Sequence, residues 1–325
     1  MGVAIKIAGL RHAYPARLPW KRGKPALRGL DMEVAEGEIF GFLGANGAGK
    51  TTTIKILVGL LRPDAGEASL LGVSSREVES RRQLGFMPEN PYFYEYLTAR
   101  ETLAFYAALS GMPAREHRPR AEELLEFVGL ADAGDVRVKE FSKGMRQRLG
   151  IAQAVCHRPR LVILDEPMSG LDPNGRRAVR EMILHLHREG ATVFFSSHVL
   201  ADVEMLCGRV GLLAGGAVAA CGPVAALLSA RATAWEVGAE GVGAALRERL
   251  AGTAVRVFSP AGPEGETLFT FRERTAAEEA LRQTLAAGAK PTVYRAARET
   301  LEDYFMRTTG QGRAEIGRWS GGADK

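Results

Sequence analysis

A glycine-rich turn at residues 44–52 constrains the fold of this chain more than any other feature. The apolar run at 39–43 before it predicts a buried strand, and residues 50–60 after it predict a helix. Glycines in such a turn let successive backbone N–H groups point inward at an anion, and the helix N-terminus adds positive potential there. The pattern GxxxxGKT between a strand and a helix is typical of a loop that binds nucleotide phosphates.

The loop supplies two side chains with specific chemistry besides its backbone donors. Lys50 offers a positive charge to the β- and γ-phosphates, and the Thr51 hydroxyl can ligate Mg²⁺. Chance glycines in an ordinary strand–turn–helix unit are the alternative, but both flanking elements that the motif requires are predicted. We therefore expect ATP and Mg²⁺ to bind here. The residues expected at the nucleotide are Gly44, Asn46, Gly47, Ala48, Gly49, Lys50, Thr51 and Thr52.

Length and composition fit a folded protein with one large and one smaller domain. The chain has 325 residues, of which 46% are hydrophobic and 25% are charged. Its three cysteines form no CxxC pair, so we expect neither a disulfide framework nor a zinc site, and the N-terminus lacks a signal-peptide pattern. No acidic residue precedes Asp31, whereas several Lys and Arg do. This basic end indicates either attraction to anionic lipid, nucleic acid or nucleotide, or simply a solvated loop.

Residues 210–230 carry no charge and have the length of a transmembrane helix. Pro223 interrupts this stretch, and Gly215 and Gly216 separate two short apolar runs within it. The pattern predicts a strand–turn–strand hairpin followed by a small helix. We therefore expect no membrane span in this chain.

Apolar alternation at 3–7 and 27–34 predicts two half-buried strands of an antiparallel edge sheet. Tyr14 lies between them and is either an aromatic that stacks on adenine or a packing tyrosine. Further strands are predicted at 68–71 and 84–87, and Glu89 follows in a loop bounded by prolines. Residues 98–128 have helical spacing and predict a helical insertion in the nucleotide fold.

A second helix with an exposed N-terminus is predicted from residue 142 to about 156. Ser142 is a natural N-cap, and Gly144 permits the close approach of another group. Such an N-terminus either receives an anion or is simply a capped helix.

Acidic and basic side chains follow two predicted buried strands. The strand at 161–164 ends in Asp165 and Glu166, at the place where α/β folds position their chemistry. We expect Asp165 to hold Mg²⁺ and Glu166 to polarise the attacking water. Residues 169–172 lead into a helix through residue 188, and the strand at 191–195 is followed by His198, which is placed to hydrogen-bond a γ-phosphate.

Beyond residue 230 the composition shifts, and the pattern predicts a second domain. Strands at 233–237, 254–258, 267–272 and 291–294 alternate with helices at 242–250 and 275–286. This βαββαβ order is that of a ferredoxin-like unit. A last helix is predicted at 299–307, followed by a Gly- and Arg-containing tail.

Taken together, these stretches resemble the ATP-binding cassette (ABC) family over roughly residues 3–230. The resemblance rests on six motifs in the family's order: the phosphate loop, the signature segment at 141–145, the second nucleotide motif at 161–166, the D-loop at 169–172 with Asp172, the switch histidine His198 and the adenine-stacking Tyr14. It implies an α/β P-loop NTPase cassette with an antiparallel edge sheet and a helical insertion at about 92–157. The expected domains are this cassette at 1–230, a small C-terminal α+β, ferredoxin-like regulatory or dimer-supporting domain at 231–308, and a disordered tail at 309–325.

The resemblance also implies a function. In this family two cassettes dimerise head to tail, so that Ser142 and Gly144 of one face the γ-phosphate held by Lys50 of the other. Catalysis would fall to Glu166 as general base, with His198 and Lys50. The expected partners are a second cassette, as a homodimer, and a separate multi-span permease, at the cytoplasmic face of the cell membrane; no nucleic acid is expected.

Two departures from the family pattern resemble exporter-type cassettes. Glu89 takes the position of the Q-loop glutamine and so joins Thr51 and Asp165 as an expected Mg²⁺ ligand, and the signature reads Phe-Ser-Lys-Gly-Met. Two alternatives to a membrane exporter stay open. One is a soluble cassette ATPase acting on nucleic acid or ribosomes, and the other is a non-hydrolysing ATP-responsive module.

Overall fold

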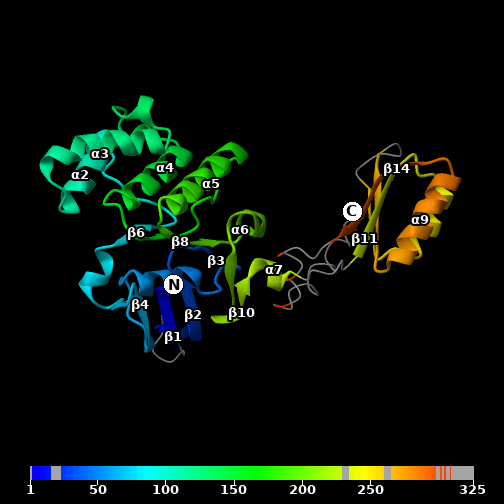
Figure 1. Cartoon of the computed structure of the whole chain (residues 1–325), viewed down its shortest axis with the longest axis horizontal. Coiled ribbons are helices and arrows are strands. Elements are labelled where there is room, and N and C mark those ends of the chain that lie inside the picture. The colour runs from blue at the N-terminus through cyan, green and yellow to red at the C-terminus, as the bar shows by residue number, and fades with distance from the viewer. Residues whose placement is uncertain are drawn as a thin grey trace, which may run out of the picture. The chain divides into compact units, whose positions relative to one another are not determined.

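The computed structural model of the chain describes residues 2–15, 23–228, 234–259, 265–297, 301, 304 and 308. The chain divides into two compact units, Met1–Val224 and Ala225–Lys325. The first unit contains two sheets and most of the described helices, and the second contains one sheet with helices against it (Figure 1). The expected domain boundary at residue 230 lies outside the described residues.

An antiparallel sheet in the order β2-β1-β4-β5 forms the edge of the first unit (Figure 1). The predicted alternation is confirmed in the second strand, where Leu30, Met32 and Val34 are buried. In the first strand Ile5 and Ile7 are buried, but Val3 at its start is 40% exposed. Both strands extend beyond the predicted segments, so that Tyr14 pairs with Lys24 at their far ends. The strands are β1 (Val3–Tyr14), β2 (Lys24–Ala35), β4 (Ala65–Leu70) and β5 (Val73–Ser74).

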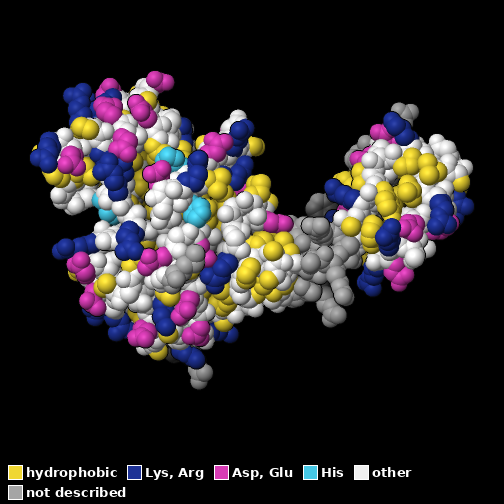
Figure 2. Space-filling view, viewed as in Figure 1, with side chains coloured by type: hydrophobic (Ala, Val, Ile, Leu, Met, Phe, Trp, Pro, Cys, Tyr) yellow, Lys and Arg dark blue, Asp and Glu magenta, His cyan; other side chains and the backbone are white. Residues whose placement is uncertain are grey.

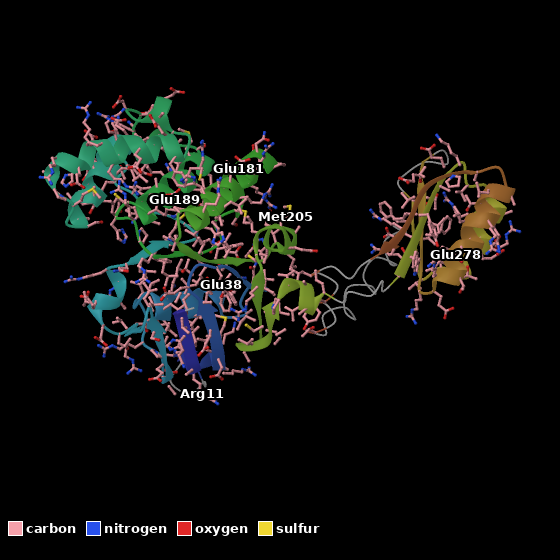
Figure 3. All side chains as sticks on the ribbon, viewed as in Figure 1. Arg11, Glu38, Glu181, Glu189, Met205 and Glu278 are labelled. Carbon is pink, nitrogen blue, oxygen red and sulfur yellow. The ribbon has the colours of Figure 1, made fainter. Side chains whose placement is uncertain are left out.

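The second sheet has the order β10-β9-β3-β8-β7-β6, and its strands β9 to β6 run parallel. Strand β7 is apolar and buried throughout, and β8 is buried throughout with Val193, Phe194 and Phe195 at its centre, as expected for a parallel sheet covered on both faces. Glu38, labelled in Figure 3, precedes β3 and accepts 2.7 Å hydrogen bonds from Arg209 and from the Ala35 N–H, which ties β9 and β2 to it. The strands are β3 (Ile39–Gly44), β6 (Leu84–Met87), β7 (Leu161–Leu164), β8 (Thr192–Ser197), β9 (Arg209–Ala214) and β10 (Ala217–Pro223).

Helix α1 (Lys50–Leu57) follows the glycine-rich loop and joins both sheets in one core. Ile54 and Ile56 of α1 are buried in the same cluster as Leu10 of the antiparallel sheet and Phe40 of the parallel sheet. The helix ends three residues earlier than predicted, because Gly59 adopts a left-handed conformation with φ 76° just beyond it.

The predicted helical insertion consists of separate helices, α2 (Ala99–Leu109), α3 (Ala114–Phe127) and α4 (Lys143–Ala154). The single helical pattern expected at 98–128 is broken because Gly111 is left-handed, with φ 76°, and Pro113 follows it. Thr98 and Glu101 form a capping box at the start of α2. These helices gather on one side of β6 and β8 in Figure 1.

The uncharged stretch at 210–230 forms the predicted hairpin. Strands β9 and β10 pair antiparallel around Gly215 and Gly216, and the short helix α7 (Val224–Leu227) follows. Among the residues that the structure describes, no helix combines the length and apolar character needed to cross a membrane. Two more helices complete the unit, α5 (Pro173–Arg188) and α6 (Leu200–Leu206), together with the 3₁₀ turns η1 (Val78–Arg81), η2 (Ala131–Ala133) and η3 (Val138–Glu140).

The second unit has the predicted ferredoxin-like order of elements. Its sheet has the strand order β12-β13-β11-β14 with all neighbours antiparallel, which is the split βαβ arrangement. Val237, Phe269, Phe271 and Leu246 form its core. The helix predicted at 299–307 and the tail lie mostly outside the described residues. The elements are β11 (Ala234–Glu240), α8 (Ala244–Ala251), β12 (Arg256–Phe258), β13 (Thr267–Phe271), α9 (Arg274–Ala286) and β14 (Lys290–Ala297).

Candidate nucleotide site

A cavity of about 450 Å³ opens beside the glycine-rich loop, where β3, β6, β7 and β8 end. In open α/β sheets, ligands bind outside the carboxyl ends of the strands. The cavity therefore lies where the sequence predicts the nucleotide. Its lining consists of Tyr14, Lys24, Pro25, Ala26, Ala45, Asn46, Gly47, Gly49, Lys50, Thr51, Thr52, Glu89, Glu166, Ser169 and His198.

The backbone of the loop requires glycine at several positions. Gly47 and Gly49 are left-handed, with φ 81° and 114°. A Cβ on Gly49 would lie 2.8 Å from the Ala26 carbonyl oxygen, and one on Gly44 would lie 2.7 Å from the carbonyl oxygen of Leu213. The loop is thus packed closely between neighbouring backbones, and α1 begins directly after it with its N-terminus at the cavity.

Three ionisable side chains meet at the loop. The Lys50 ammonium lies 3.2 Å from Glu166 Oε1 and donates a 2.5 Å hydrogen bond to the Gly44 carbonyl. The other oxygen of Glu166 lies 2.7 Å from His198 Nδ1. Lys50 and Glu166 are buried, whereas the His198 side chain is 43% exposed. The carboxylate of Glu166 therefore joins a cation of the phosphate loop to a histidine from the end of β8.

A buried serine fixes the two acidic residues after β7. The Ser196 hydroxyl donates a 2.6 Å hydrogen bond to Asp165 Oδ1 and accepts one of 2.8 Å from the Glu166 N–H. Glu166 has φ 49°, a left-handed conformation that is rare for a residue with a side chain. Burial raises the pKa of Asp165 above its ordinary value, while hydrogen bonds with Ser196 and Thr51 act in the opposite direction.

These residues fit Mg²⁺ together with a nucleotide. Mg²⁺ prefers oxygen ligands and in phosphate sites is held by one or two protein groups plus the substrate's phosphates. Thr51 interacts with Asp165 closely enough to oppose the rise that burial causes in the pKa of that carboxyl, and Thr51 and Glu89 both line the cavity. No group of three or more His, Cys, Asp and Glu side chains suited to a metal occurs in the described part of the chain. These few oxygen groups fit a Mg²⁺ ion whose other ligands are phosphate oxygens.

Tyr14 lies at the rim of the cavity, 39% exposed, with its hydroxyl 3.3 Å from Thr52 Oγ1. Its cross-strand partner Lys24 lines the same cavity. Ala48 is buried in the loop behind the cavity and accepts a hydrogen bond from the Gly216 N–H at its carbonyl. The aromatic and the phosphate loop are therefore in direct contact.

Six predicted site residues do not line the cavity of their own chain: Gly44, Ala48 and Asp165, which belong to the loop or to the end of β7, and Ser142, Gly144 and Asp172. Ser142 caps α4, with its hydroxyl accepting a 3.2 Å hydrogen bond from the Met145 N–H, and Gly144 lies in the first turn of that helix. Asp172 caps α5 by accepting a 2.7 Å hydrogen bond from the Gly175 N–H. Ser142, Gly144 and Asp172 thus lie at the starts of two helices, and none of them lines the cavity with Lys50 of the same chain.

Sequence reasoning missed several residues at the site. Ser196 is the most important, and its position directly before Ser197 and His198 at a strand end was the available signal. Ala26 and Leu213 wall the phosphate loop through their carbonyl oxygens, and this contact depends on strand pairing that a sequence does not show. Lys24 also lines the cavity, whereas the sequence places it only among the basic residues before Asp31.

The fold and this site define a P-loop NTPase. The profile of the ABC transporter family matches residues 27–169. An uncharacterized ABC transporter ATP-binding protein of a Nostoc species is 38% identical over 93% of this chain and 88% of its own length. The chain therefore belongs to the ATP-binding subunits of ABC transporters.

Two further similarities agree with this family. The bacitracin transport ATP-binding protein of Bacillus licheniformis is 45% identical over 57% of this chain and 60% of its own length. A solved structure described as the ATP-binding subunit of an ABC transporter shows 33% identity and a TM-score of 0.62, covering 69% of this chain and 91% of the other. The chain spans less than two thirds of the length of several curated relatives that it matches.

Proposed function

We propose that this chain hydrolyses ATP at the cavity, with Glu166 as general base, and that hydrolysis drives export through a separate permease. The observation that carries the proposal is the buried Glu166 carboxylate, which lies between Lys50 of the phosphate loop and His198. A carboxylate in this place can accept the proton of an attacking water while the loop holds the phosphates.

The chain's own groups would each have a defined task. Backbone N–H groups of the loop and the Lys50 ammonium bind the phosphates, and Thr51, Asp165 and Glu89 would hold Mg²⁺, which neutralises phosphate charge when bound. Glu166 takes the proton from water, a role worth roughly 10²–10⁴-fold in rate. His198 orients that carboxylate through the 2.7 Å contact, and it would hydrogen-bond the γ-phosphate when ATP is bound.

A second copy of the chain would complete the site. Ser142 and Gly144 lie at the exposed start of α4, away from the cavity of their own chain. A helix N-terminus is suited to an anion, and here the capping hydroxyl occupies only the Met145 N–H. We assign this terminus and Asp172 to the nucleotide of a partner cassette in a head-to-tail homodimer. The second unit, from 231 to 308, is assigned the role of supporting this dimer.

The permease would bind an exposed aromatic cluster close to Glu89. Tyr94 lies 5.7 Å from both Tyr96 and Phe105, measured between ring centroids. Tyr96 is 68% exposed and Tyr92, earlier in the same segment, is 83% exposed. Exposed aromatic clusters of this kind mark protein interaction sites. Because Glu89 lines the cavity, movement at this segment would be linked to the nucleotide. Such binding would hold the chain at the cytoplasmic face of the membrane.

We propose that the chain serves an exporter and does not act on nucleic acid. The Glu89 and Phe-Ser-Lys-Gly-Met variants resemble exporter-type cassettes, and a relative's name assigns it to bacitracin transport. Figure 2 shows Lys and Arg side chains interspersed with Asp and Glu over the visible face of the first unit, instead of one basic surface. Nucleic-acid binding favours a gathered basic patch.

The test is co-purification of the tagged full-length chain from mild-detergent extracts with ATP present. Wild type and Glu166→Gln should both recover the same multi-span membrane protein, and Tyr96→Asp should lose it because it places a charge in the aromatic cluster. Leu60→Asp is the matched control, since Leu60 is also 68% exposed but lies in the turn after α1. Recovery of ribosomes or nucleic acid without a membrane protein would contradict the proposal.

A further inference from the structure

A histidine is buried directly behind Tyr14. The register of β1 shifts between Ile7 and Leu10 and again between His12 and Ala13, so a simple period of two does not assign the faces of this strand. His12 is buried like Ile5, Ile7 and Leu10 before it. The ring of His12 is 4.9 Å from that of Tyr14, at 88°, an edge-to-face contact. Arg11, the residue before His12, is exposed and lies at the rim of the unit in Figure 3.

The environment of His12 is unusual for a buried polar group. Its side chain is 9% exposed, and within the described chain neither ring nitrogen has a hydrogen-bond partner. Asp64 Oδ1 lies 3.5 Å from Nδ1, while its other oxygen accepts a 2.7 Å hydrogen bond from the Ala13 N–H. Buried polar groups in proteins are nearly always hydrogen-bonded. The core packing of this strand therefore does not account for a histidine here.

Tyr14 is also held from its other end. Its hydroxyl lies 3.3 Å from the Thr52 hydroxyl in the first turn of α1, directly after the phosphate loop. Thr52 is buried, and Tyr14 lines the cavity. The tyrosine is thus fixed between the His12 ring and the helix that carries Lys50.

We propose that His12 is a positioning residue for ATP: its edge-to-face contact holds Tyr14 at the angle at which Tyr14 receives the nucleotide base. This inference rests on the proposed function, because it takes the cavity to be the ATP site. His12 does not line the cavity, so it would act on the nucleotide only through Tyr14 and hence only on the base. Loss of the ring should weaken ATP binding but leave the binding of inorganic triphosphate, which has no base, unchanged.

The test compares His12→Leu with His12→Phe in the full-length chain. Leucine fills the apolar space without an aromatic ring, and phenylalanine keeps an aromatic ring but lacks the nitrogens. Calorimetric titration with ATP and with inorganic triphosphate gives two dissociation constants for each protein. An edge-to-face contact predicts a roughly three- to tenfold weaker ATP affinity for His12→Leu, with recovery in His12→Phe. The KM for ATP should rise in the same ratio, with kcat at saturating ATP unchanged.

Several results would overturn the proposal. Equal losses for ATP and triphosphate would show a general structural role, and a His12→Phe variant as weak as His12→Leu would show that the aromatic contact does not position Tyr14. Unchanged ATP affinity in both variants, with wild type binding ATP, would refute the role of His12 and leave the proposed function standing. A wild-type protein that binds neither ATP nor inorganic triphosphate would refute both the role of His12 and the proposed function.

Discussion

Replacing Ser196 by alanine removes the hydroxyl that fixes both acidic residues of the site. The Ser196 side chain is fully buried, and its oxygen donates to Asp165 and accepts from the Glu166 N–H. Alanine fits the same space, so the perturbation is the loss of two hydrogen bonds with little change in packing. Glu166 also loses the contact that stabilises its left-handed backbone at φ 49°.

The magnitude follows from these contacts. A hydrogen bond to a charged group contributes about 1.5–3 kcal/mol, and a buried N–H left without a partner costs about 1–3 kcal/mol. The two effects share one side chain and are not additive, so we expect the free energy of unfolding to fall by roughly 2–4 kcal/mol. A carboxylate displaced by about 1 Å lowers the rate by roughly 10²-fold, which sets the expected fall in kcat.

Urea unfolding and steady-state ATP hydrolysis measure these two effects. Ser197→Ala is the matched control, because among the described residues the Ser197 hydroxyl is hydrogen-bonded to the backbone of Val199 and not to the acidic residues. We expect it to change kcat by less than about threefold, in line with small effects away from a site. A Ser196→Ala protein with wild-type kcat, or equal losses in the two variants, would refute the reasoning.

Two further changes test the packing around the site. Gly49→Ala places a Cβ 2.8 Å from the Ala26 carbonyl oxygen and strains the backbone at φ 114°, so ATP titration should show no binding. Gly72→Ala is the control, because Gly72 has φ 84° but open space around it, and this variant should bind ATP normally. Normal ATP binding by Gly49→Ala would count against a closely packed loop. Arg120→Met loses hydrogen bonds to the carbonyls of Val155 and Cys156 at the end of α4. Urea unfolding should show that the free energy of unfolding falls by about 2–4 kcal/mol. Arg158→Met is the control, because the Arg158 side chain is 64% exposed, and its free energy of unfolding should fall by less than about 0.5 kcal/mol. Similar losses in both would show that the buried guanidinium does not stabilise the helix end.

The sequence was most informative where a motif coincides with a strand end. The strands at 84–87 and 161–164 were predicted with the bounds that β6 and β7 have. Their short apolar runs end abruptly in Pro88 and in Asp165, so sequence alone marks where each stops. The residues following these strands, Glu89 and Glu166, therefore meet in one cavity as expected.

Contacts between distant segments could not be predicted in the same way. Ala26 and Leu213 surround the phosphate loop only because β2 and β9 lie beside it. The break between α2 and α3 was missed although the sequence marks it, because Gly111 and Pro113 stand close together and residues 113–123 contain no Leu, Ile, Val, Met or Phe. The left-handed conformation of Gly111 ends the first helix. His12 looks like an ordinary strand residue until its ring is seen against Tyr14.

The most direct test of the central claim is ATP hydrolysis by the purified chain and its Glu166→Gln variant, measured beside their ATP affinities. Glutamine keeps the size of the side chain but cannot accept a proton from water. The account predicts that the variant still binds ATP while its hydrolysis rate falls by roughly 10²–10⁴-fold. A variant that hydrolyses ATP at a rate near that of wild type would contradict the assignment of Glu166 as the general base, and with it the proposed mechanism.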